Sequence, residues 1–576
     1  MAVTITCYGS VNEIGGNKIL LEYAERRVLF DFGKAFGRYG QYFDGVFAKE
    51  RDARGLLDPL SLGLIPPLRG LLRDDLVPVF DPDDLDITHV PPEGRQRKER
   101  IQVERKAGTV DAFWNYWRRR TRKTFRDLRR PNAPPVDMIL ISHAHQDHIS
   151  DLEYVEPSLP IAGTRMTAFI GKVLLDMAVS NKSGAAYINP AAPNEAGLVR
   201  VAPDQDYVGR PWHFLDHALV PDADGSGLDS AESFWRTPIG KQLQMPAPPD
   251  LIPGVRWWPV DHSILGAASY AVETEAGWVA YTGDLRFHGK HQQFSRVFAE
   301  QLAALKPVAL ICEGTRLTKE KTRAEDLTDE SQVRDNCLRA VQKAGGQLVV
   351  ADFSSRNVER LLAFQDIARQ TQRRLLIHTR DAYLLHAMRL ADPALMSEMN
   401  DESIGLYADL RSQKDWENDL CQRYGHEVVS PQDVCNHPGD YILAFSLGDM
   451  ADLLDLQFLM GKRPGGVYIF SNSGAYDDEQ SVDLLRVWQW AQYLKLTVVG
   501  MRLERAGNKP SRVCVEPGYH ASGHAAASDL REFVETVRPK WLIPIHTEHP
   551  GWWADHLHGS GTVIAVPKMG RPVTIS

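Results

Sequence analysis

The stretch SHAHQDHIS, residues 142–150, constrains this chain most, because it places four potential metal ligands within six positions. They are His143, His145, Asp147 and His148, and they follow the apolar run MILI. Desolvating so many polar side chains beside a buried strand is costly unless they bind a partner. Imidazole and carboxylate suit zinc, and four such groups on one loop can serve two ions about 3.5–4 Å apart. The stretch therefore predicts a metal site at the end of a buried strand.

The rest of the first half contains short β-branched runs punctuated by glycine, such as VTITCYG, RVLFDFG and WVAYTGD. These runs predict a strand-rich α/β body. Polar side chains follow several of them abruptly, where sites assemble in layered α/β folds. The residues at these strand ends are Asp31, His143, His262, Asp284 and Glu313.

From about Thr318 the pattern changes to helices that alternate with buried strands, as in NVERLLAFQDIARQT followed by RRLLIHT. This alternation is typical of a doubly wound parallel sheet. Near Asn508 the strand-rich character returns. We therefore expect one domain formed by residues 1–317 and 508–576, with a second domain, 318–507, inserted into it.

Two segments fit neither part. Residues 36–135 contain proline-rich and acidic loops, and residues 185–250 are expected to form long loops. Within the first, eight of the thirteen residues 118–130 are Lys or Arg, and aromatic side chains recur at helical spacing. Two interpretations stay open for this basic helix. It presents RNA-binding arginines, or it is a structural helix with a solvated face. The arginines concerned are Arg118, Arg119 and Arg122.

Composition limits the partners of the chain. It has 576 residues and a net charge of −9, so a surface for nucleic acid must be local. The six cysteines form no CxxC pair, which favours reduced thiols. No apolar run reaches about 18 residues and no signal peptide is evident, so we expect a cytoplasmic protein without membrane association.

The motif HAHQDH matches the HxHxDH signature of the metallo-β-lactamase fold, and VLFDFG, VDHS and TGD resemble its other motifs in the same order. The resemblance implies an αββα sandwich that binds two zinc ions. One ion would be held by His143, His145 and His262, and the other by Asp147 and His148. Asp284 would bridge the ions, and Asp31 would orient the histidine loop.

Later motifs resemble the β-CASP nucleases, most closely the RNase J group. They are Glu313 in CEGTR, His524 in SGHA and His546 in PIHTE, and VVADFSSRNVER resembles the inserted β-CASP α/β domain. The resemblance implies that His546 completes the second zinc site. It also implies that Asp147, His524 and Glu313 take part in catalysis. His524 would assist the departing 3′ oxygen, and Glu313 would orient His524.

A phosphate pocket is a further expectation, since hydroxyl side chains suit that ligand. Turn and capping roles for the same hydroxyls are the alternative. The residues are Ser354, Ser355, His520 and Ser522.

The resemblance implies a zinc-dependent ribonuclease that uses a two-metal mechanism on single-stranded RNA, with 5′-exonuclease or endonuclease activity, or both. A β-CASP DNA exonuclease is the alternative, and a small-molecule metallo-hydrolase is a weaker one. His546 favours RNA, because DNA-acting members tend to have an apolar residue there. Manganese and a homo-oligomer stay open. Thr547 replaces the glycine usual in the last motif, which predicts a shifted loop.

Overall fold

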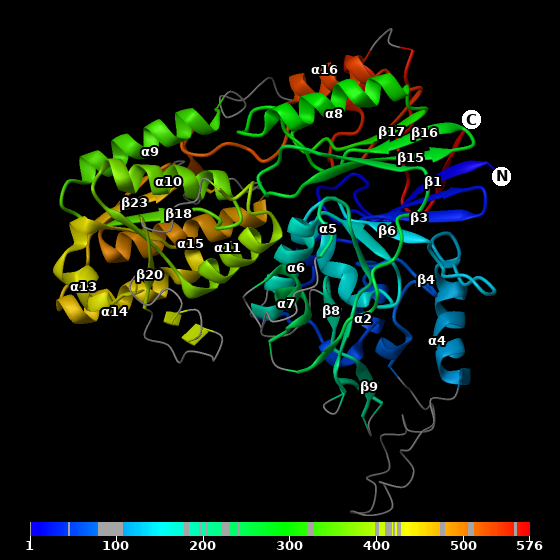
Figure 1. Ribbon diagram of the computed structural model, residues 1–576, viewed down its shortest axis with the longest axis horizontal. Helices are drawn as coiled ribbons and strands as arrows, with labels where there is room; N and C mark the ends of the chain where they lie inside the picture. Colours follow the sequence, from blue (N-terminus) through cyan, green and yellow to red (C-terminus); the bar gives the residue numbers. More distant parts are fainter. Residues whose placement is uncertain are drawn as a thin grey trace, which may run out of the picture.

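The structure is a computed structural model in which two α/β bodies lie side by side (Figure 1). It describes residues 2–576 apart from 44–46, 79–106, 178–183, 195–196, 203–204, 220–229, 240, 319–327, 398–402, 409–416, 419–420, 423–427, 473–477, 505–511 and 558–560. The strand-rich body contains both ends of the chain, and the second body contains most of the long helices from α9 to α15.

Two sheets form the centre of the strand-rich body. The first has the strand order β12-β7-β6-β3-β2-β1-β29. Its strands are β1 (Val3–Cys7), β2 (Ile19–Tyr23), β3 (Arg26–Phe30), β6 (Met138–Leu140), β7 (Ile161–Gly163), β12 (Trp212–Phe214) and β29 (Pro572–Ile575). The second has the order β14-β15-β16-β17-β27-β28. Its strands are β14 (Val255–Pro259), β15 (Ala268–Thr274), β16 (Gly277–Tyr281), β17 (Ala309–Cys312), β27 (Trp541–Pro544) and β28 (Val563–Ile564).

The facing surfaces of the two sheets are apolar and pack into one core, which includes Phe30, Leu140, Tyr270 and Ile311. Helix α6 (Arg165–Met177) lies below the first sheet. Helices α8 (Gln292–Leu305) and α16 (Ala527–Val537) pack on the second, through Phe298 and Phe533 among others (Figure 1). The order of layers is helix, sheet, sheet, helix, which confirms the predicted αββα sandwich.

The second body contains a parallel sheet with the order β21-β20-β19-β22-β18-β23-β24. Its strands are β18 (Val349–Asp352), β19 (Arg374–Ile377), β20 (Ile404–Tyr407), β21 (Val428–Val429), β22 (Tyr441–Ala444), β23 (Gly466–Phe470) and β24 (Leu496–Val499). The helices include α9 (Glu330–Ala344), α10 (Val358–Gln370), α11 (Thr379–Ala391), α13 (Pro431–Asn436), α14 (Leu453–Met460) and α15 (Asp478–Leu494).

The second body interrupts the first in sequence but not in space. Strand β17 precedes it and β27 follows it, yet the two pair in parallel with Ile311 opposite Ile543. The hairpin of β25 (Met501–Glu504) and β26 (Arg512–Val515) lies on the return path. The predicted domain limits at 318 and 507 stay predictions, because 319–327 and 505–511 lie outside the described residues.

The prediction of long loops for residues 185–250 is wrong in part. Tyr187 and Tyr207 are buried against each other, and the strands that carry them pair within a small sheet. This region forms β8 (Tyr187–Ile188), β9 (Ala191–Pro193), β10 (Val199–Val201), β11 (Tyr207–Gly209), β13 (Leu243–Gln244) and helix α7 (Ala231–Arg236). The earlier segment forms α1 (Phe36–Gly40), α2 (Leu57–Ser61), β4 (Leu68–Arg69), α4 (Ala107–Arg120) and β5 (Arg126–Asp127).

The basic helix is shorter than its aromatic spacing predicts. Helix α4 ends at Arg120, where the Thr121 hydroxyl donates to the Trp117 carbonyl at 2.8 Å. The chain then turns, and β5 pairs with β4. Phe125 and Leu128 still pack on the body, but from either side of β5 rather than from a helix. Nowhere in the described chain does a helix combine the length and the apolar character needed to cross a membrane.

Candidate metal centre

The histidine loop is held in place by Asp31, as predicted for its role. Asp31 follows β3 with a left-handed backbone (φ 53°) and is fully buried. Its carboxylate accepts hydrogen bonds from the Ser142 backbone N–H and hydroxyl, each at 2.7 Å, and lies 2.7 Å from Nδ1 of His148. Tyr281 also donates to it. The loop therefore starts from a fixed point between β6 and helix α5 (Gln146–Ile149).

Three histidines from two sheets form one donor group. Nδ1 of His145 lies 3.0 Å from Nε2 of His143 and 3.1 Å from Nε2 of His262. His262 follows β14, and its Nδ1 lies 2.5 Å from the carbonyl oxygen of Gly523. This contact leaves Nε2 directed at the other two histidines. In metal sites, the second nitrogen of a ligating imidazole usually has such a partner, which orients the ring.

A second donor group lies beside the first. Asp147, His148, Asp284 and His546 each offer an atom within 4.8 Å of the others. Oδ2 of Asp284 lies 3.0 Å from Nε2 of His148 and 3.8 Å from Nε2 of His546. The same oxygen lies 3.7 Å from Nε2 of His143 in the first group. Asp284 is therefore placed between the two donor groups.

The donor atoms fit divalent cations on their own chemistry. Both carboxylate oxygens of Asp284 and Nε2 of His148 are buried and have no hydrogen-bond partner in the described part of the chain. Buried polar atoms without partners cost free energy. A set of imidazoles and carboxylates at these separations satisfies those atoms by binding metal.

The electrostatics favour the metal-binding protonation states of His143, His145 and Asp147. Burial, followed by the neighbouring histidines, holds the pKa of His143 well below its ordinary value. Burial also lowers the pKa of His145 to about 3. For Asp147, burial raises the pKa, but His148 and His546 outweigh it and hold the pKa below the usual value. Neutral imidazoles and an ionised carboxylate are the forms that ligate metal. For His148, burial lowers the pKa, but the neighbouring carboxylates, Asp284 foremost, outweigh it and hold the pKa well above its ordinary value.

His524 lies at the edge of this cluster and contacts Glu313. Its Nδ1 is 3.2 Å from Oε2 of Glu313 and 3.9 Å from Oδ2 of Asp284. Burial lowers the pKa of His524, but the carboxylates of Glu313 and Asp284 outweigh it and raise the pKa to about 9. The sequence did not indicate Thr315, whose hydroxyl lies 2.7 Å from Oε2 of Glu313 and 2.8 Å from Nδ1 of His546. Thr315 therefore links the His524–Glu313 pair to His546.

The glycine replacement at Thr547 does not strain the loop. The left-handed backbone occurs at His546 (φ 51°), and Thr547 does not share it. The His546 backbone N–H donates to the Ser10 carbonyl at 3.0 Å, and its Nε2 lies 3.1 Å from Oδ2 of Asp147. The His546 imidazole therefore reaches the second donor group, and the shifted loop stays a prediction.

The residues expected to bind phosphate have structural contacts as well. The Ser522 hydroxyl accepts the His524 backbone N–H at 3.1 Å, and the Ser354 carbonyl accepts the Asn357 N–H at 2.9 Å. Ser354 and Ser355 are half-buried ahead of α10. Burial lowers the pKa of His520 to about 4. The capping interpretation therefore describes contacts that exist, while the phosphate pocket stays a prediction.

Arg356 is a second residue that the sequence did not indicate. It follows the serine pair, and its positive charge acts with burial to lower the pKa of His145. The carboxylate of Asp147 in turn interacts electrostatically with the guanidinium of Arg356. Arg356 is half-buried and makes no ion pair with another described residue. In the sequence, only its position directly after the Ser354-Ser355 pair could have indicated that Arg356 lies near the site.

The predicted basic residues do not join the metal centre. Arg118 and Arg119 are on α4 and Arg122 follows it, at the outer side of the strand-rich body, whereas α5 faces the second body (Figure 1). All three are exposed.

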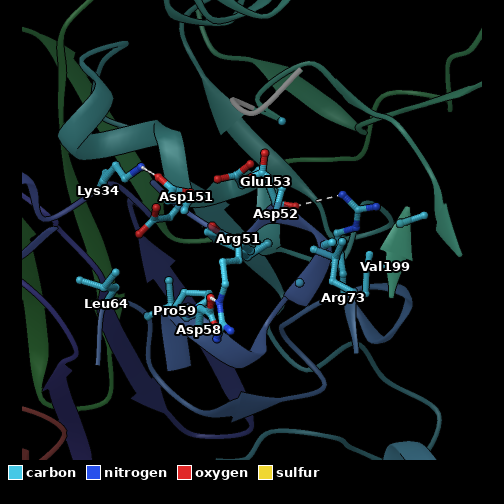
Figure 2. Close-up of a pocket in the computed structure, with 18 of the residues that line it drawn as sticks. Lys34, Arg51, Asp52, Asp58, Pro59, Leu64, Arg73, Asp151, Glu153 and Val199 are labelled. Atoms are coloured by element: carbon cyan, nitrogen blue, oxygen red, sulfur yellow. Dashed lines mark hydrogen bonds and ion pairs between the residues drawn. The ribbon is translucent and has the colours of Figure 1, made fainter. Parts of the chain in front are cut away.

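A cavity of about 590 Å³ lies behind the metal loop, between the two segments that fit neither domain pattern (Figure 2). Asp151, four residues after Asp147, is among its lining residues and forms a buried ion pair with Lys18 at 2.8 Å. Lys34 pairs with Glu50. Charged groups of both signs line the cavity, together with apolar side chains.

Comparisons with known proteins agree with this geometry. Residues 512–564 match the family model described as the RMMBL, Zn-dependent metallo-hydrolase RNA specificity domain. Ribonuclease J 2 of Streptococcus pyogenes is 21% identical over 424 residues, 73% of this chain and 60% of the relative. Ribonuclease J of Mycolicibacterium smegmatis is 21% identical over 440 residues, 75% and 61% of the two chains. The chain thus spans about 60% of the length of these relatives.

An archaeal protein and a solved structure extend the comparison. Ribonuclease J of Pyrococcus abyssi is 22% identical over 299 residues, 50% of this chain and 58% of the relative. A protein of unknown function from Enterococcus faecalis has a crystal structure with a TM-score of 0.59 at 16% identity, over the full length of both chains. The matches confirm the resemblance to metallo-β-lactamase proteins of the β-CASP type and to the RNase J group.

Proposed function

We propose that this chain, which resembles the RNase J group of the β-CASP metallo-hydrolases, is a zinc-dependent ribonuclease that hydrolyses RNA phosphodiester bonds. The observation that carries the proposal is the place of Asp284. Its Oδ2 lies between the two donor groups and within 3.9 Å of His524. A centre for two cations and a protonated imidazole therefore meet at one point.

The two donor groups divide the metal-binding work. His143, His145 and His262 would hold one ion, Asp147, His148 and His546 the other, with Asp284 shared. When bound, two zinc ions supply a water of pKa about 7 and neutralise negative charge on the phosphate oxygens. Asp31 fixes the loop that presents these ligands. Manganese is the alternative ion, because the nitrogen and oxygen donors suit it as well.

His524 supplies the proton that the leaving group needs. With its pKa raised to about 9, the imidazole is protonated at neutral pH. Nδ1 faces Glu313, so Nε2 is the nitrogen available to donate to the departing 3′ oxygen. Glu313 and Thr315 orient the ring, and the carboxylate of Glu313 supplies charge that keeps it protonated.

Single-stranded RNA is the proposed substrate, because the matched domain is described by RNA specificity and the named relatives are ribonucleases. The proposal includes 5′-exonuclease action, endonuclease action or both, in the cytoplasm. Ser354, Ser355, His520 and Ser522 would contact the substrate phosphate. A DNA exonuclease of the same fold is the second candidate, since the metal centre itself acts on a phosphodiester of either sugar.

The test compares internally labelled 5′-monophosphate RNA with sequence-matched single-stranded DNA, using the wild type and Asp147→Ala with bound metal measured in each. We expect cleavage of RNA alone and its loss in the variant. Mononucleotide products indicate exonuclease action, and discrete long fragments indicate endonuclease action. Preferential cleavage of DNA would select the second candidate, and a metal-loaded wild type that cuts neither polymer would refute both.

A further inference from the structure

Helix α4 is anchored by one face only. Trp114 and Trp117 are almost completely buried in the core below the first sheet. Nε1 of Trp114 donates to Asp74 Oδ1 at 2.9 Å, and the Thr121 hydroxyl closes the end of the helix. Because these contacts fix both the rotation and the end of α4, the side chains on its other face have a defined position.

Five cations occupy that other face and the turn that follows it. We call them the α4 basic face, and they are Arg118, Arg119, Arg120, Arg122 and Lys123. All five are exposed, and none forms an ion pair with any residue that the structure describes. Arg120 lies 6.0 Å from the ring of Tyr116, which is itself 49% exposed.

The next basic residues along the chain behave differently. Arg126 pairs with Glu22 at 2.8 Å, Arg129 with Asp127 at 2.7 Å, and Arg130 with Asp137 at 3.1 Å. The acidic residue on α4, Asp111, is already paired with Arg69. Among the residues that the structure describes, these five adjacent cations therefore have no carboxylate partner, unlike their neighbours, although the whole chain is acidic. A structural helix with a solvated face does not require a cluster of cations without ion-pair partners.

We propose that the α4 basic face is a second RNA site, outside the catalytic centre, that binds the sugar-phosphate backbone of a long substrate. This rests on the proposed ribonuclease function for the identity of the polyanion. Unpaired guanidinium groups bind phosphate oxygens, and the exposed ring of Tyr116 offers a surface on which a base can stack. The face lies on the outer side of the strand-rich body, away from the second body (Figure 1).

The position of the α4 basic face determines which substrates it affects. A short oligonucleotide in the metal centre does not reach α4, whereas a long RNA can contact both. The α4 basic face therefore adds affinity for long substrates without changing the chemical step. Contacts of this kind carry no base specificity, and their contribution falls as salt rises because bound counterions are released.

The experiment measures RNA binding directly. Arg118→Gln/Arg119→Gln/Arg122→Gln and a matched control, Lys306→Gln/Lys343→Gln/Lys462→Gln, are made in the Asp147→Ala background so that the RNA stays intact. The control replaces three exposed lysines elsewhere, so both variants change the net charge equally, from −8 in the Asp147→Ala parent to −11. Binding of a long unstructured RNA is followed by fluorescence anisotropy over a series of salt concentrations, after thermal melting has shown that both variants fold.

We expect the arginine variant to bind at least about tenfold more weakly at low salt, and its slope of log affinity against log salt to fall by about 2, since each phosphate contact contributes about 0.7. The control keeps the parental slope. Equal binding by the two variants would refute the second site and leave a solvated helix face. Loss of binding to anionic phosphatidylserine vesicles, with RNA binding intact, would also refute it in favour of a membrane surface.

A cleavage measurement separates this proposal from the proposed function. With Asp147 restored, the arginine variant should raise KM for long RNA and leave kcat/KM for a short oligonucleotide unchanged. If the wild type cleaves no RNA, the ribonuclease proposal fails while the binding result still decides the second site. If short and long substrates lose kcat/KM equally, α4 acts on the catalytic centre and the second site is refuted.

Discussion

Oδ2 of Asp284 lies 3.0 Å from Nε2 of His148, and neither atom has a hydrogen-bond partner among the described residues. Buried polar atoms without hydrogen-bond partners cost free energy. The same carboxylate is close to the histidines of the other donor group. In the metal-free chain this contact is a buried ion pair, and the position of Asp284 between the two donor groups would let it serve as a shared ligand.

Asp284→Asn should remove the shared ligand. The amide keeps the shape but loses the charge that two cations need, so we expect the bound metal to fall from two equivalents to one or none, with cleavage lost in parallel. Metal content after gel filtration is the measurement, and Asp555→Asn, an exposed carboxylate outside the cluster, is the control. A variant that retains two equivalents would show that Asp284 does not bridge.

Asp31→Asn tests the support of the histidine loop. The carboxylate fixes Ser142 and His148 at 2.7 Å but is not in either donor group. Changes to such supporting groups typically cost about 10–100-fold in metal affinity. We expect a reduction of that order in a competition titration with a chelator, while excess zinc restores cleavage. No rescue by zinc would contradict a role limited to orienting the ligands.

The His524–Glu313 pair predicts the alkaline limit of activity. With a pKa raised to about 9, His524 is protonated throughout neutral pH, and its proton is lost as the pH rises through about 9. The rate should fall there. Glu313→Gln removes the largest of the charges that raise this pKa, so the decline should move to lower pH. His524→Ala should reduce kcat by about 10²–10⁴-fold.

The pH profile of kcat distinguishes this role from a structural one. The control is Glu548→Gln, which changes an exposed carboxylate two residues after His546. If Glu313→Gln lowers the rate equally at every pH, Glu313 supports the fold rather than the proton on His524.

Much of the metal centre could be predicted because its ligands come in short motifs at strand ends. The motif HAHQDH itself fixes the spacing of its candidate ligands. The strands before Asp31, His262 and Asp284 are apolar runs, and the end of each run marks the end of the strand. The parallel sheet of the second body was predictable for the same reason. Helix and strand periods alternate there without interruption.

The remainder depends on contacts between distant parts of the chain, which local patterns do not contain. Thr315 joins His524 and His546 only because β17 and β27 are neighbours in the second sheet. Helix α4 was predicted too long because Phe125 and Leu128 continue its spacing, although they pack on the core from positions directly before and after β5. In both cases tertiary pairing decided the outcome.

A buried carboxylate in the second body predicts how stability depends on pH. Asp352 ends β18 and is buried, and burial raises its pKa to about 7. Tyr468 donates to Oδ2, while Oδ1 has no hydrogen-bond partner in the described chain. The Tyr468 hydroxyl favours the ionised carboxylate, but burial outweighs it, so the protonated acid is preferred. The ordinary pKa of this acid in an unfolded chain is about 3.9.

Because the folded pKa is higher than the unfolded one, the protonated acid favours folding. Its contribution is complete below about pH 4 and is lost as the pH rises through about 7, by about 1.4 kcal/mol for each pH unit between the two values. Asp352→Asn cannot ionise and should remove this loss. We expect its urea midpoint, followed by circular dichroism, to change less between pH 5 and 8 than that of the wild type. Parallel profiles for the two proteins would show that Asp352 does not titrate in this range, and Asp440→Asn, which changes an exposed carboxylate directly before β22, serves as the control.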